Sequence, residues 1–178
     1  MIHPAQKRAF ASLCALFDAP IIQNNLRGLY VEHLVCELLG QDWTVSGADW
    51  SAWDIEHLDG TKLEVKQSAA AQTWHEGQQA APSPRFGIRV PSSPWDGKKY
   101  IEGGRRLADV YVFAWHPLRA DSCDQRDPEQ WQYFAVRSDS LPQQKSISLK
   151  GIRTLSDPLS SDELAGAVEQ IRRRKILQ

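Results

Sequence analysis

Residues 53–66 read WDIEHLDGTKLEVK, and this stretch decides the fold class. Apolar and polar residues alternate along it, which is typical of β-strands with one buried face. The pair Asp59-Gly60 interrupts the alternation with a sequence that favours a tight turn. We therefore predict a β-hairpin made of two strands, Trp53–Leu58 and Thr61–Lys66.

The length of the turn decides which polar side chains of the hairpin share a face. Residues two apart on a strand point the same way, so Glu64 and Lys66 lie together. A two-residue turn would place Asp54 opposite Val65, with its side chain on the other face. A three-residue turn over 58–60, with a left-handed glycine, would place Asp54 opposite Glu64. Convergence of the two carboxylates therefore predicts the three-residue turn.

The sequence on either side of the hairpin predicts a mixed α/β order. Residues 108–115 are almost continuously apolar, which is typical of a strand buried on both faces in a sheet flanked by helices. The apolar stretch after Lys7-Arg8 is interpreted as a helix, not a signal peptide, because no cleavage site precedes Pro20. The predicted elements are a helix over 9–17 that ends near Pro20, a helix over Leu26–Leu39 stopped by Gly40, a strand over Trp43–Val45, the hairpin, strands over Ala108–Trp115, Trp131–Val136 and Ser146–Leu149, and a helix over 160–175 that begins with the capping box Ser160–Glu163.

Length and composition limit the class of protein. A chain of 178 residues corresponds to about one domain, so we expect a single domain over 1–178 with its core at about 26–136. The chain is 42% hydrophobic and 24% charged, which excludes a disordered tail. A net charge of −1 excludes an overall basic coat protein for nucleic acid. Three cysteines without paired spacing, and no apolar run near the ~20 residues of a membrane span, predict a cytoplasmic protein without membrane association.

Asp54, Glu64 and Lys66 are the residues with the clearest chemical potential. Two carboxylates a few ångströms apart repel each other and need a cation between them, and their oxygen ligands suit Mg²⁺. Water held by Mg²⁺ can attack a phosphodiester while the metal neutralises phosphate charge. A neighbouring lysine can orient or deprotonate that water, or stabilise developing negative charge. The alternative is a solvated outer face of the hairpin, which Lys62, Glu64 and Lys66 would also serve.

A helix that carries Glu32 precedes the hairpin, which presents Asp54 on its first strand and Glu64-Val65-Lys66 on its second. Over about Leu26–Val136, this arrangement resembles the PD-(D/E)XK superfamily of restriction-endonuclease-like nucleases. Trp53 stands where the motif of that superfamily has proline. The resemblance implies an α/β fold with a mixed β-sheet flanked by helices.

The resemblance also implies roles for individual residues. Asp54 and Glu64 would bind the metal, and Lys66 would be the catalytic lysine. Glu32 would match the acidic residue on the first core helix, which is sometimes a metal ligand, and Gln67 the polar residue that follows the lysine. The implied activity is hydrolysis of DNA phosphodiester bonds with Mg²⁺ or Mn²⁺ as cofactor, commonly by a homodimer that cuts two strands.

The segment 69–104 is irregular in sequence and is the basic part of a nearly neutral protein. A structureless loop of this length is unusual, so we expect an insertion that contains some helix or an extra strand. Basic residues interleaved with aromatic ones can contact phosphates and stack on bases, whereas the alternative is a loop that its tryptophans anchor to the core. The candidate DNA-binding residues are Arg85, Arg89, Lys98, Lys99, Arg105 and Arg106.

Two other classes of function stay open at the level of sequence. One is a binding module on the same fold with an inactive site and with DNA or a protein as its ligand. The other is a structural or regulatory protein that interacts through the tryptophan-rich segment. Cleavage of labelled DNA by the wild type, Asp54→Ala and Lys66→Ala would separate these classes.

Overall fold

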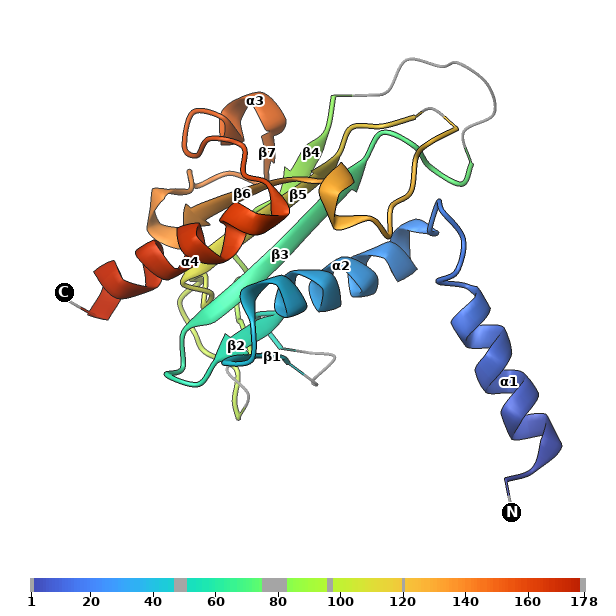
Figure 1. Ribbon diagram of the computed structural model, residues 1–178. Coiled ribbons are helices and arrows are strands. Elements are labelled where there is room, and N and C mark those ends of the chain that lie inside the picture. Colours follow the sequence, from blue (N-terminus) through green and yellow to red (C-terminus); the bar gives the residue numbers. More distant parts are fainter. Residues whose placement is uncertain (1, 47–50, 75–82, 96–97, 120, 177–178) are drawn as a thin grey trace.

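A five-stranded mixed β-sheet forms the centre of the protein (Figure 1). The strands β3 and β5 pair in parallel, and the other neighbours in this sheet pair antiparallel. The computed structural model describes residues 2–46, 51–74, 83–95, 98–119 and 121–176. In spatial order the strands are β1 (Trp43–Val45), β2 (Ile55–His57), β3 (Lys62–Ala69), β5 (Val110–His116) and β6 (Gln132–Arg137). The predicted mixed α/β class is therefore confirmed.

The strand β5 is buried along its whole length, as its continuous apolar sequence predicts. It pairs with β3 over seven residues and with β6 on its other side. It begins at Val110, two residues later than expected, and the side chain of Asp109 just before it accepts a hydrogen bond from the backbone N–H of Lys62. Two 3₁₀ turns, η1 (Pro128–Gln130) and η2 (Ser138–Ser140), flank β6.

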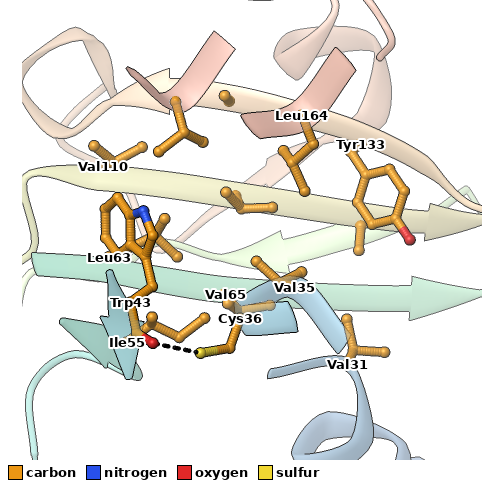
Figure 2. Packing of buried hydrophobic residues seen from close by; sticks show 14 of the residues in the cluster. Val31, Val35, Cys36, Trp43, Ile55, Leu63, Val65, Val110, Tyr133 and Leu164 are labelled. Atoms are coloured by element: carbon orange, nitrogen blue, oxygen red, sulfur yellow. Dashed lines mark hydrogen bonds between the residues drawn. The ribbon is translucent and has the colours of Figure 1, made fainter. Parts of the chain in front are cut away.

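Two long helices, α2 (Asn24–Leu39) and α4 (Ser161–Ile176), cover one face of the sheet (Figure 1). The helix α2 ends at Gly40, whose φ of 95° is in the left-handed region, as the sequence predicts. The predicted capping box at α4 is present, since Glu163 accepts hydrogen bonds from the backbone N–H and the hydroxyl of Ser160. Figure 2 shows the resulting core, which includes Val31, Val35, Leu63, Val65, Val110, Tyr133 and Leu164.

The opposite face of the sheet is covered differently from the prediction of helices on both sides. A second, two-stranded antiparallel sheet lies there, with the four-residue helix that follows it. Phe86, Ile147 and Ile152 from these elements pack with Phe113 and Phe134 of the central sheet. The elements are β4 (Arg85–Gly87), β7 (Ser146–Ser148) and α3 (Leu149–Ile152).

The segment 69–104, predicted to be irregular, contributes regular structure at two places. The strand β3 continues into it as far as Ala69, and β4 is the extra strand that the sequence led us to expect. Parts of the segment, 75–82 and 96–97, lie outside the described residues. The bounds of β4 were not predicted, because three residues are too few to show an alternating pattern. The equally short β1 was predicted at its observed bounds, and β7 lies within the predicted strand Ser146–Leu149.

The hairpin has the three-residue turn that convergence of the carboxylates requires. The N–H of His57 donates to the carbonyl of Thr61, with N and O 2.9 Å apart, and Gly60 has a φ of 82°. Ile55 therefore lies opposite Leu63, and this register continued by one residue sets Asp54 against Glu64. The predicted register is confirmed, although β2 is shorter than the expected strand Trp53–Leu58.

The first helix, α1 (Pro4–Ala15), begins and ends earlier than the predicted span of 9–17. It buries no residue and projects away from the sheet (Figure 1). Its apolar residues at helical spacing are exposed instead of packed against the core, Phe10 to 70%. No helix among the described residues has both the length and the apolar character needed to cross a bilayer.

Candidate active site

The site lies where β2 separates from β3. The two strands pair only as far as Ile55 and Leu63, and the backbone N–H of Asp54 already donates to the carbonyl of Leu63. The carboxylate of Asp54 then takes the place of the next backbone partner, because its Oδ2 accepts a hydrogen bond of 2.7 Å from the N–H of Val65. This bond fixes the Asp54 carboxylate against β3 between Glu64 and Lys66.

Glu64 and Lys66 share one face of β3, as the period of two predicts. The ammonium group of Lys66 contacts Oε1 of Glu64, and the two residues lie beside Tyr111 and Phe113 of β5. Their side chains are only 16% and 32% exposed, so the alternative of a solvated outer face is wrong for this pair. Lys62, two residues earlier, places its ammonium 3.6 Å from the centre of the Trp53 ring instead.

Glu32 joins this group from α2. Its side chain is half-buried and lines a pocket together with Asp54. Burial raises the pKa of Glu32 to about 7, and the nearby charges of Asp54 and Glu64 add to the rise while Lys66 opposes it. Glu32 is therefore within electrostatic range of all three residues, and of the three it shares a pocket with Asp54 alone.

Burial and mutual repulsion act on the remaining carboxyls as well. Burial raises the pKa of Asp54, against the opposing effects of Lys66 and the Val65 N–H. Burial also raises the pKa of Glu64 to about 7, with Asp54 adding to the rise. Burial alone would lower the pKa of Lys66, but the three carboxyls together raise it. Three acids beside one lysine give the site an excess of negative charge, which favours uptake of a proton or a cation.

The donor atoms present fit a hard cation with few protein ligands. Asp54 uses Oδ2 for the Val65 N–H, and Glu64 uses Oε1 for Lys66, so each carboxylate keeps a second oxygen for a ligand. Over the described residues, no group of three or more His, Cys, Asp or Glu side chains is arranged to hold a metal ion. Mg²⁺ commonly binds one or two carboxylates and keeps several waters, so Asp54 and Glu64 fit it. The metal role of Glu32 stays a prediction.

Gln67 does not join the acid–lysine cluster. Its Oε1 accepts a hydrogen bond of 2.8 Å from Nε of Arg27, and its amide nitrogen donates to Asn24. Successive residues of β3 point to opposite faces, so Gln67 lies on the α2 side of the sheet, away from Lys66. Gln67 therefore links β3 to α2, and the role that the resemblance implies for it stays a prediction.

Arg27 is fully buried, and the sequence analysis did not single it out. Its guanidinium donates to neutral oxygens only, those of Ile22, Asn24, Gln67, Gln72 and Gln125. Its spacing of four and eight residues from Val31 and Val35 would have placed it on the buried stripe of the helix.

The six basic residues predicted to bind DNA lie in different environments. Arg106 donates to the carbonyls of Ile88, Leu141 and Pro142, and Arg85 donates to the hydroxyl of Ser146. These bonds hold the segment to its neighbours. The other four, Arg89, Lys98, Lys99 and Arg105, are exposed.

Two open pockets border the acid–lysine cluster. One, of about 560 Å³, lies beside α2 and is lined by Glu32 and Asp54. The other, of about 500 Å³, lies over β3 and is lined by Glu64, Lys66 and Arg89. Half-buried charges thus border space that a substrate can enter.

The amino-acid sequence matches no protein-family model, and no curated protein is significantly similar to it. The chemistry of the site is therefore interpreted from its own residues.

Proposed function

We propose that the protein is a metal-dependent nuclease of the restriction-endonuclease-like type that hydrolyses DNA phosphodiester bonds. The observation that carries the proposal is the gathering of Glu32, Asp54, Glu64 and Lys66 where β2 leaves β3, at the border of two pockets. An excess of buried carboxyls with one lysine suits a divalent cation and an anionic substrate better than it suits stability.

Asp54 and Glu64 would have one role in the reaction, and Lys66 would have another. A divalent cation held by Asp54 and Glu64 would neutralise phosphate charge and supply a polarised water. The Val65 N–H orients the carboxylate of Asp54, so this ligand is held in place before any cation arrives. Lys66, in contact with Glu64, can donate a hydrogen bond to a phosphate oxygen that gains charge in the transition state. A homodimer that cuts both strands of a duplex stays a prediction.

A cleavage assay tests the proposal. Labelled DNA, single-stranded and duplex, is incubated with the protein in Mg²⁺, in Mn²⁺ or in chelator. We expect cleavage only with a metal ion, and a loss of at least about a hundredfold in rate for Asp54→Ala and Lys66→Ala. Lys150→Ala is the matched control, because Lys150 is an exposed lysine on α3 that does not line either pocket, and its rate is expected to equal that of the wild type.

Other outcomes point to other functions. Cleavage that persists in chelator or in both site variants would overturn the assignment of these residues. Binding of DNA without cleavage under every condition would favour the inactive binding module. No binding of DNA at all would favour the protein-interaction class.

A further inference from the structure

The pocket over β3 has room for part of a substrate beside the side chains of Glu64 and Lys66. Its volume of about 500 Å³ lies within the range of small-ligand sites, roughly 300–1,000 Å³. Its floor carries Glu64, Lys66 and Tyr111, and the exposed Arg89 also lines it. Lys66 and Arg89 thus supply positive charge that suits a phosphate group, and the volume of the pocket can accept a further part of the same ligand.

An aromatic pair forms another part of the pocket lining. Trp95 and Tyr100 face each other across an isolated antiparallel bridge, with ring centres 5.0 Å apart in an edge-to-face arrangement. Tyr100 nevertheless remains 64% exposed, and the buried Pro94 also lines the pocket. An aromatic ring that is held in position but open to solvent is a stacking platform for a flat ligand.

The geometry of DNA decides which nucleotide can use this platform. A base inside a duplex presents only its edges in the grooves, while its faces stack on neighbouring base pairs. Its ring therefore cannot lie on Tyr100 unless the nucleotide leaves the stack. Extrusion of a base from a duplex costs a few kcal/mol of unstacking and unpairing free energy. This cost is smallest when the base is already unpaired.

We propose that the pocket lined by Glu64, Lys66, Arg89, Trp95 and Tyr100 binds one unpaired nucleotide, with its phosphate beside Lys66 and Arg89 and its base against Tyr100. The substrate is then single-stranded or locally unpaired DNA, not an intact duplex. This inference rests on the proposed nuclease function and names its substrate class. A single strand has one backbone to cut, so this substrate would not require the homodimer that cleavage of both strands of a duplex would use.

Binding measured in chelator tests the pocket separately from catalysis. The probes are a fluorescent DNA strand of about 12 nucleotides and the same sequence as a blunt duplex. We expect the wild type to bind the strand at least about tenfold more tightly than the duplex. Tyr100→Ala should weaken strand binding by about five- to a hundredfold, while Tyr100→Phe, which keeps the ring, should bind as the wild type does.

Phe10→Ala is the control for loss of an exposed aromatic residue outside the pocket, and it should leave binding unchanged. Thermal melting of each variant checks that the fold is intact. Equal affinity for strand and duplex, no binding of either, or strand binding by Tyr100→Ala equal to that of the wild type would overturn the inference. Failure to cleave DNA with any metal ion would overturn the nuclease proposal, whereas the strand preference in chelator would be unaffected.

Discussion

Glu32 shows how a site can destabilise the protein that carries it. In the folded chain its pKa is raised to about 7 by burial and by the charges of Asp54 and Glu64, from an ordinary value of 4.5. Between these two values the folded state binds a proton that the unfolded state has lost. The stability of the metal-free protein therefore falls as pH rises through this range, and the loss persists above it.

Glu32→Gln removes this penalty. Its free energy of unfolding should exceed that of the wild type by about 1 kcal/mol at about pH 8, and the difference should disappear toward about pH 4.5. Urea unfolding in chelator at both pH values measures the effect. Glu37→Gln, an exposed glutamate on the same helix, is the control. A Glu32→Gln difference that is independent of pH would contradict the prediction.

Individual residues were predictable from the sequence only when their partners were close along the chain. Asp54, Glu64 and Lys66 belong to one hairpin, so alternation left only the turn length to decide whether their side chains share a face. The partners of Arg27 include Gln125, which is almost a hundred residues away in the chain. No local sequence pattern predicts such a contact. The partners of Gln67 were not predictable for the same reason, because its bond to Arg27 depends on how α2 packs on β3.

At the level of elements, the turn of the hairpin controls the site. Gly60 has a φ of 82°, and a Cβ atom built there meets no other atom within 4 Å. Gly60→Ala should therefore destabilise the protein by about 1 kcal/mol through backbone strain alone, without a steric clash. Urea unfolding measures the change.

Gly166→Ala is the matched control for that substitution. Gly166 lies within α4 and also has open space around a Cβ atom, but without a left-handed backbone. It should stabilise the protein by up to about 1 kcal/mol, because alanine favours the helix. Equal effects of the two substitutions would show that the left-handed conformation of Gly60 is not what stabilises the turn.

The face of the central sheet opposite α2 and α4 is covered by a pairing, β4 with β7, that could not be predicted from the sequence. The strands β4 and β7 contain three residues each and lie about sixty residues apart in the chain. Each depends on the other for its hydrogen bonds and on Phe113 and Phe134 for burial. Such strands form because of tertiary packing, not because of their own propensity.

At the scale of the whole molecule, α1 stands apart from the folded core. None of its residues is buried, so the helix contributes no packing to the chain that the structure describes. Deletion of residues 1–16 should shift the melting temperature by less than about 2 °C and leave DNA cleavage unchanged. Thermal melting and the cleavage assay check this, and a fall of more than about 5 °C would show that α1 supports the core.

The distribution of charge is also a property of the whole molecule. The net charge of −1 conceals two local groups of charge: the carboxyls of Glu32, Asp54 and Glu64, and five exposed cations between Arg85 and Arg105. The folded chain brings one of these cations, Arg89, to the same pocket as Glu64 and Lys66. An anionic ligand would therefore meet a local charge pattern that the overall composition conceals.

Local sequence patterns were enough to predict the mixed α/β class, the buried strand β5 and the hairpin that carries Asp54, Glu64 and Lys66. The three-residue turn followed only on the condition that the two carboxylates converge. These predictions depend on alternation, turn chemistry and hydrophobic runs, which act over a few residues. The packing of distant segments brings Glu32 within electrostatic range of Asp54 and Glu64, covers one face with a second small sheet, and places Trp95 and Tyr100 in a pocket beside Lys66. Such contacts join distant segments, and they are chosen by packing and burial across the whole fold, which no short pattern contains.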